Sequence, residues 1–81
     1  MSLIWIVKAE YVDKYKINLS FNDGLEKVVD LQDCIFKGNR KIFSPLKDVD
    51  FFKDFTQNSW TIEWKNGLDF APEYLYKLAQ N

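Results

Sequence analysis

The chain has 81 residues, which allows one domain spanning residues 1–81 and only a small core. Hydrophobic residues make up 47% of it and aromatic residues 17%, so a few large rings can supply much of the buried area. The net charge of −1 gives no general electrostatic attraction to nucleic acid or to an anionic membrane.

The cysteine and histidine content excludes several classes of site. Cys34 is the only cysteine and there is no histidine, so neither an intramolecular disulfide nor a structural zinc site can form. A single free thiol is typical of a reducing compartment, and we expect a cytoplasmic protein. The apolar stretch at residues 3–7 is too short to span a membrane, so we expect no membrane association. We also expect no cofactor.

The N-terminal half predicts an antiparallel meander. Residues 4–12 are rich in β-branched and aromatic side chains, and the pattern places Trp5, Val7, Ala9 and Tyr11 on one face with Ile4 and Ile6 on the other. Residues 15–21 alternate strictly between apolar and polar. Asn22–Gly24 then supply a turn, and residues 25–31 return as a third strand.

The C-terminal half predicts a hairpin and two helices. After an irregular stretch at 32–46, residues 47–55 indicate a short helix with Asp48 as its N-cap. In residues 59–64 the alternation directs Trp60, Ile62 and Trp64 inward, and Asn66-Gly67 turns the chain into a short return strand at 68–70. Pro72 suits the first position of a closing helix. The expected fold is α+β: a meander plus a hairpin, about four or five strands, with two short helices packed on the sheet.

Catalytic chemistry has little support in the sequence. Cys34 has no histidine to act as its base, and a small apolar residue near the core is the better interpretation. Glu63 and Asp69 flank the hairpin, but strand geometry directs Glu63 to solvent. We expect Asp69 to accept hydrogen bonds from amides of the turn or of the helix start. The expected catalytic and metal-binding residues are therefore none, and the protein is expected not to be an enzyme.

The basic cluster Lys37, Arg40 and Lys41 lies between Phe36 and Phe43. Basic residues interleaved with aromatic ones can hold single-stranded nucleic acid through phosphate contacts and stacking. The cluster is small, so a solvated surface loop is the preferred interpretation. Nucleic-acid binding through these three basic residues is kept as the alternative function.

The aromatic residues indicate a binding surface for protein. The chain has fourteen of them, and a core of this size is not expected to bury them all. Tyr74 and Tyr76 fall on different sides of the last helix, and exposed aromatic residues favour protein interfaces. We therefore predict a partner-binding surface, with core packing as the competing interpretation and self-association as a further possibility. Its predicted residues are Phe36, Arg40, Phe43, Tyr74 and Tyr76.

A set of short motifs occurs in a fixed order along the chain. They are FNDG at 21–24, VDL at 29–31, FSPLKD at 43–48, FF at 51–52 and TIEWKNGLDFAPEYLY at 61–76. In this set and order the sequence resembles the bacterial family called domain of unknown function 2442 (DUF2442). The resemblance covers about residues 7–78, and its most specific part is W-x-N-G-x-D-x-x-P-x-x-L-Y.

The resemblance implies a small α+β domain with an antiparallel sheet and no established catalytic residues. It also implies that the gene lies beside another small gene, in an arrangement similar to a toxin–antitoxin pair. Some family members carry a helix-turn-helix domain after this one. Because the sequence ends at Asn81, we expect no such segment and no direct operator binding. The expected function is a protein-interaction module that binds the product of the adjacent gene.

Overall fold

The N-terminal half forms the predicted meander in the computed structural model, which describes residues 3–38 and 41–80. Strands β1 (Ile6–Asp13), β2 (Lys16–Phe21) and β3 (Glu26–Asp30) pair antiparallel in the order β1-β2-β3. Ile17 pairs with Val29, and both side chains are buried on the inner face. Gly24 adopts a φ of 96° in the β2–β3 turn, a conformation that favours glycine. The alternation in residues 15–21 therefore predicted the inner face of β2 correctly.

A bulge changes the predicted faces of the first strand. Ile6 pairs with Phe21 and Lys8 pairs with Ser20, so Val7 is an extra residue with no partner of its own in β2. The bulge puts Ile6 on the inner face, where it is 1% exposed, together with the half-buried Ala9. Val7 is 50% exposed. The prediction that Val7 shares a face with Ala9, opposite Ile6, was wrong, because strict alternation fails at a bulge.

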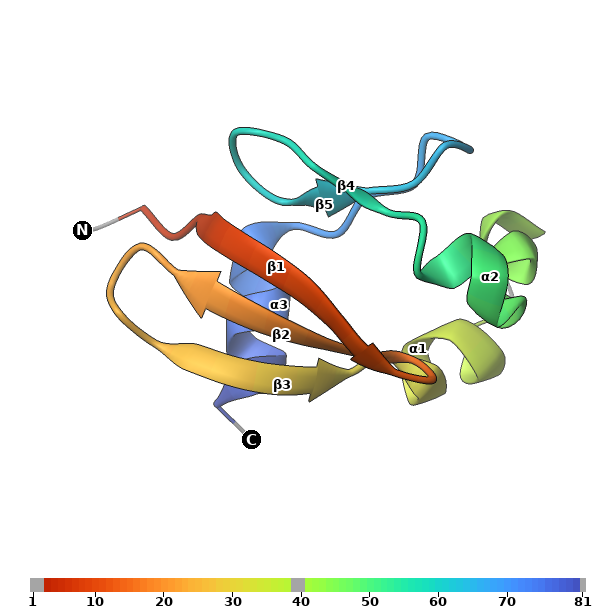
Figure 1. The fold of residues 1–81 in the computed structure, drawn as a ribbon, viewed down its shortest axis with the longest axis horizontal. Coiled ribbons are helices and arrows are strands. Elements are labelled where there is room, and N and C mark those ends of the chain that lie inside the picture. The colour runs from red at the N-terminus through yellow and green to blue at the C-terminus, as the bar shows by residue number, and fades with distance from the viewer. Residues whose placement is uncertain (1–2, 39–40, 81) are drawn as a thin grey trace.

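The middle of the chain is more helical than predicted. Helix α1 (Gln32–Lys37), the 3₁₀ helix η1 (Lys41–Lys47) and helix α2 (Val49–Phe52) follow one another at one end of the sheet (Figure 1). Asp48 caps α2 as expected, accepting a hydrogen bond from the amide of Asp50. Phe52 is fully buried, and its ring contacts the rings of Tyr11 and Tyr15. Phe52 thereby anchors α2 to the meander.

The predicted turn at Asn66-Gly67 forms, but the return strand expected at 68–70 is only a single bridge, and the two-stranded hairpin lies before that turn. Trp60 also does not face inward as predicted. Strands β4 (Thr56–Gln57) and β5 (Ile62–Glu63) pair, and Asp69 bridges back to Glu63. Asn58 Oδ1 accepts hydrogen bonds from the amides of Trp60 and Thr61, which holds a bend in place of the expected strand. Trp60 is therefore 54% exposed, whereas Trp64 is 3% exposed.

Helix α3 (Pro72–Ala79) closes the fold and crosses one face of the meander, as Figure 1 shows. Pro72 occupies its first turn as predicted, and Leu75 and Ala79 are buried. The chain is thus α+β: a three-stranded antiparallel sheet, a two-stranded hairpin and several short helices. Within the described ranges, no helix has the length and apolar character needed to cross a membrane. The buried core consists of Ile6, Ile17, Leu19, Phe21, Val29, Leu31, Ile35, Leu46, Phe52, Ile62, Trp64, Leu68, Phe70, Leu75 and Ala79.

Candidate functional site

An open hollow of about 380 Å³ lies where α1, η1, the return of the hairpin and α3 meet. We call it the α1–α3 hollow. Its volume is at the lower end of the range of about 300–1,000 Å³ typical of ligand pockets, so it fits one side chain better than a folded segment. Its lining residues come from three separate parts of the chain: Cys34, Phe43, Leu68, Asp69, Phe70, Ala71 and Tyr74.

Three aromatic rings in the hollow are close to parallel. The rings of Phe43 and Phe70 have centroids 6.1 Å apart and planes inclined by 20°. Those of Phe70 and Tyr74 are 6.0 Å apart and inclined by 12°. Phe70 is 7% exposed and Tyr74 is 42% exposed, so the set runs from the core out to the surface. Such surfaces bind planar or apolar groups through their faces.

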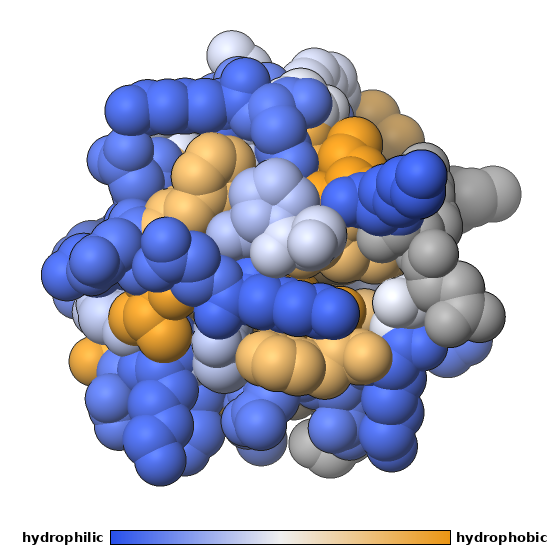
Figure 2. All heavy atoms as spheres, turned by 90° about the vertical axis from the view of Figure 1, so that its right-hand side faces the viewer, coloured by the Kyte–Doolittle hydropathy of each residue, from blue (hydrophilic) through white to orange (hydrophobic). Residues whose placement is uncertain are grey.

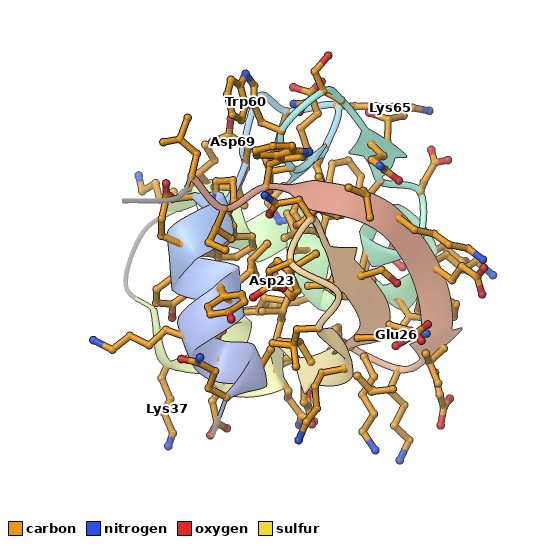
Figure 3. All side chains as sticks on the ribbon, turned by 90° about the vertical axis from the view of Figure 1, so that its left-hand side faces the viewer. Asp23, Glu26, Lys37, Trp60, Lys65 and Asp69 are labelled. Atoms are coloured by element: carbon orange, nitrogen blue, oxygen red, sulfur yellow. The ribbon has the colours of Figure 1, made fainter. Side chains whose placement is uncertain are left out.

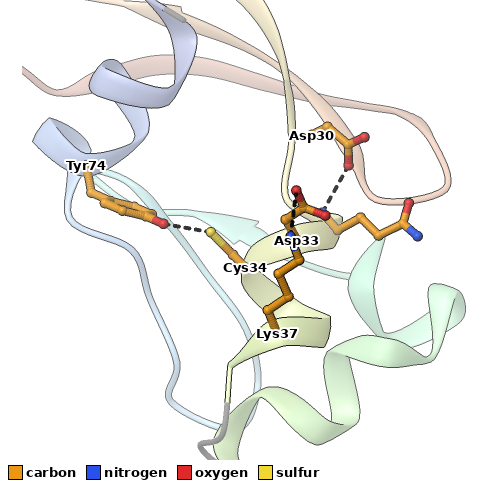
Figure 4. Close-up of polar contacts among 6 residues, drawn as sticks. Asp30, Asp33, Cys34, Lys37 and Tyr74 are labelled. Carbon is orange, nitrogen blue, oxygen red and sulfur yellow. Dashed lines mark hydrogen bonds and ion pairs between the residues drawn. The ribbon is translucent and has the colours of Figure 1, made fainter.

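Tyr74 joins helix α3 to helix α1. Its hydroxyl lies 2.7 Å from Cys34 Sγ, a contact drawn in Figure 4. This hydrogen bond, together with burial and the negative charge that Cys34 gains when it ionises, raises the pKa of Tyr74 to about 12. Tyr74 is therefore neutral over the physiological pH range. It adds a polar group at the edge of the aromatic surface.

Gly38 allows the wall of the hollow to form. A Cβ atom at this position would lie 2.8 Å from Cδ2 of Phe43 and 2.9 Å from the carbonyl oxygen of Cys34. Because the second neighbour is backbone, a larger residue would displace α1 or the Phe43 ring. Glycine here is needed for close approach, which sets the position of Phe43 in the lining.

The side chain of Asp69 has no polar partner among the described residues. Its side chain is exposed and forms neither a hydrogen bond nor an ion pair there. The expected hydrogen bonds from turn or helix-start amides are therefore not observed; the side chain of Asn66 bonds the turn amide of Leu68 instead. Glu63 lies opposite Asp69 in the antiparallel bridge, an arrangement that directs both side chains to one face. As far as the described residues show, the hollow thus carries a negative charge at one edge that no cation neutralises.

Tyr76 lies on another side of α3. Its ring packs edge-on against Phe21, with centroids 5.0 Å apart, and its hydroxyl donates a hydrogen bond to the carboxylate of Asp23. That bond and a second one from the amide of Leu25 hold the pKa of Asp23 below its usual value. Tyr76 is thus placed to fix α3 on the β2–β3 turn. Among the predicted partner-binding residues, the structure separates it from Phe43 and Tyr74.

Phe36 and the basic residues lie outside the lining of the hollow. Phe36 is 45% exposed, but Lys47 Nζ lies 5.7 Å from its ring centroid and the ring of Tyr15 packs against it edge-on. Lys37 pairs with Asp33 at 3.8 Å and Lys41 begins η1. Arg40, the remaining member of both predicted sets, lies outside the described residues. The apolar side chains at this end form separate patches between long hydrophilic ones (Figure 2).

The structure also shows which members of the hollow the sequence pattern missed. Phe43 and Tyr74 were predicted as binding residues, and the structure brings them together with Cys34 and Asp69. The last two were assigned minor roles. No spacing relates Cys34 to Asp69, and only the folded arrangement of α1 beside α3 places both in one hollow. Within residues 3–38 and 41–80, no group of three or more acidic or cysteine side chains is placed to hold a metal ion.

Comparisons with known proteins give one match. The family model described as protein of unknown function (DUF2442) matches residues 6–81, nearly the whole chain. No curated protein and no solved structure matches the sequence.

Proposed function

The chain belongs to the DUF2442 family, and on that premise we propose that it is a non-enzymatic protein-interaction module which binds its partner through the α1–α3 hollow. The observation that carries this proposal is the convergence of three near-parallel rings on one open hollow. Interfaces typically use an anchor side chain of one protein in a well-packed pocket of the other. The size of the hollow suits such an anchor.

The exposure of Tyr74 supports a binding role over a purely structural one. Tyrosine combines a large apolar surface with a polar group and is enriched at interfaces. Tyr74 is 42% exposed although its ring stacks on Phe70. The neighbouring Leu75 is fully buried. Side chains that hold the helix in place are therefore distinct from the one that is offered to a partner.

The partner that we propose is a small protein encoded by an adjacent gene, with this chain as the antitoxin-like member of a two-gene pair. The resemblance to the family supports this choice of partner. We place the pair in the cytoplasm, where Cys34 remains a thiol. Self-association through the same hollow is the competing arrangement and is separated by the test below.

Co-purification with the adjacent gene product tests the proposal. The tagged full chain is expressed together with that product, treated with nuclease and analysed by size-exclusion chromatography with light scattering. We expect a heteromeric complex that is weakened by Tyr74→Ala and retained by Phe36→Ala, which alters an exposed aromatic outside the hollow. A chain that elutes alone, or only as a homo-oligomer, would contradict the proposed partner.

Nucleic-acid binding is the alternative function, and the nuclease step of the co-purification together with a retention assay tests it. Lys37 already pairs with Asp33, and Lys47 occupies one side of the Phe36 ring, which leaves few free contacts for a strand. We expect the double variant Lys37→Glu and Lys41→Glu to leave retention on heparin and on RNA unchanged. A clear loss of retention, or a partner released by nuclease, would favour the nucleic-acid function.

A further inference from the structure

We propose that the anchor which enters the α1–α3 hollow is an arginine side chain of the partner. This inference rests on the proposed function and specifies the chemistry that the hollow recognises. It combines two features that come from different parts of the lining. One is the set of near-parallel rings, and the other is the carboxylate of Asp69 beside them.

The aromatic surface suits a planar cation. A guanidinium group stacks on aromatic faces and is attracted by their negative charge density. Phe70 is 7% exposed and stacks on Tyr74 with planes inclined by 12°, so the ring that is offered to a guanidinium is that of Tyr74. The part of Tyr74 that remains exposed gives such a group access from solvent. An aliphatic anchor would use the apolar contact alone and would leave the carboxylate unused.

The charge at the edge of the hollow selects a cation. The Asp69 carboxylate is unpaired within the described part of the chain, and Glu63 faces the same side of the hairpin. Lys65, the cation nearest in sequence, is 2.7 Å from Asp54 and so is paired elsewhere. Lys37 lies well away from Asp69 in Figure 3. An incoming cation would therefore meet a carboxylate that has no competing partner among residues 3–38 and 41–80.

Arginine fits this arrangement better than lysine does. Its rigid, planar donors can bond both oxygens of a carboxylate while its face rests on a ring. The lysine ammonium is a strongly hydrated point charge, which cannot stack in this way. The Tyr74 hydroxyl, which is hydrogen-bonded to Cys34 Sγ, lies at the same opening and can accept a hydrogen bond from a further donor. The hollow thereby offers an aromatic ring face for stacking, and it offers the Asp69 carboxylate and the Tyr74 hydroxyl as hydrogen-bond acceptors.

The test is a selection of random peptides displayed on phage against the immobilised full chain, followed by affinity measurements on the recovered peptides. We expect recovered peptides to share an arginine. Replacing that arginine by lysine should weaken binding about tenfold, because the bidentate pair and the stacking are lost. Asp69→Asn in the protein should have an effect of similar size, because it removes the negative charge that receives the arginine. Glu73→Gln is the matched control, because Glu73 is an exposed acidic residue close to Asp69 in sequence but outside the lining.

The outcomes separate the inference from the function on which it rests. Peptides that bind through the hollow, are weakened by Tyr74→Ala and carry no arginine would overturn the arginine anchor and leave the interaction module standing. An equal loss with Asp69→Asn and Glu73→Gln would also overturn it, because attraction would then be non-specific. Failure to recover any peptide that depends on Tyr74 would contradict the proposed binding surface itself. Thermal unfolding of each variant confirms that the fold is retained.

Discussion

Two sides of helix α3 carry tyrosine residues in different surroundings. On one side, Tyr76 packs against Phe21 and its hydroxyl bonds Asp23, so the helix is attached to the meander. On the other side, Tyr74 stacks on Phe70 and bonds the thiol of Cys34, at the opening of the α1–α3 hollow. Both hydroxyl groups connect α3 to another segment, but only that of Tyr74 lies at the edge of the hollow, where we propose that a ligand reaches it.

The difference follows from what each side faces. The meander offers a regular inner face of mostly aliphatic buried residues together with Phe21, and α3 crosses this face. The region of α1, η1 and the hairpin offers large rings joined by short irregular segments, and these do not close around the helix. We infer that the meander side provides stability and the hollow side provides binding. Four substitutions test this division.

The largest expected effect comes from Leu75→Ala, which removes the fully buried residue between the two tyrosines. Loss of its side chain leaves a cavity, and the free energy of unfolding should fall by about 2–5 kcal/mol. Urea denaturation measures this change. Lys77→Ala, on the exposed surface of the same helix, is the control and should change the stability by less than about 0.5 kcal/mol. Equal effects would show that α3 does not contribute to the core.

Gly38→Ala should distort the hollow side alone. The new methyl group would meet Phe43 and the carbonyl of Cys34 at less than 3.0 Å, so we expect destabilisation of about 1–3 kcal/mol and loss of partner binding. Gly24→Ala is the matched change on the meander side. It meets no atom within 4 Å and acts only through its φ of 96°, so about 1 kcal/mol of stability should be lost with binding retained.

Tyr76→Phe, which removes the hydroxyl, should lower the stability of the chain at neutral pH, and this loss should shrink as the pH becomes acidic. Hydrogen bonds to Asp23 lower its pKa in the folded state below the usual 3.8, so this stabilisation is present above that pH and is lost as pH falls through the folded pKa. The wild-type chain should therefore exceed Tyr76→Phe in stability at neutral pH and approach it in acid. Urea midpoints measured across this range provide the check. A difference that is independent of pH would contradict the assigned bond.

The smallest effect is expected for Tyr74→Phe, and the stability difference should be present at neutral pH and disappear at alkaline pH. A folded pKa of about 12, above the ordinary 10.0, means that the stabilisation is complete below pH 10 and disappears as pH rises towards 12. The bond to Asp23 raises the pKa of Tyr76 as well, so ultraviolet titration of tyrosinate is made in the Tyr76→Phe background, where a late component should remain and be lost on adding Tyr74→Phe. Cys34→Ala should move that component to lower pH. An unchanged titration in Cys34→Ala would mean that the thiol does not bond the hydroxyl.

The sequence predicted the regular parts of the fold and missed local exceptions to regularity. Alternation gave the pairing of β2 with β3, and Asn66-Gly67 gave the hairpin turn, where Gly67 has a φ of 88°. The bulge at Val7 inserts one residue without any change in composition, so no pattern marks it. The prediction that Trp60 faces inward was wrong, because the amides of Trp60 and Thr61 donate hydrogen bonds to Asn58 Oδ1 and form a bend in place of a strand.

The hollow was predictable only in part. Phe43 and Tyr74 were identified because aromatic residues beside turns and on helix faces are often exposed. Cys34 and Asp69 belong to the same hollow only because helix α1, six residues long and without a side-chain cap, lies beside α3. So short a helix leaves too few periodic positions to be recognised. Its packing partner is distant in sequence.

The burial of Trp64 has a practical consequence for following this molecule. Its indole Nε1–H donates to the carbonyl oxygen of Phe52 at 2.7 Å, which links the hairpin to α2, and it is 3% exposed. Trp60 is largely solvated and Trp5 is half-buried. With Trp5 and Trp60 replaced by phenylalanine, tryptophan fluorescence would arise from Trp64 alone, at the end of the molecule where the hairpin meets α2. The emission of Trp64 would then report the opening of that end separately from the melting of the meander.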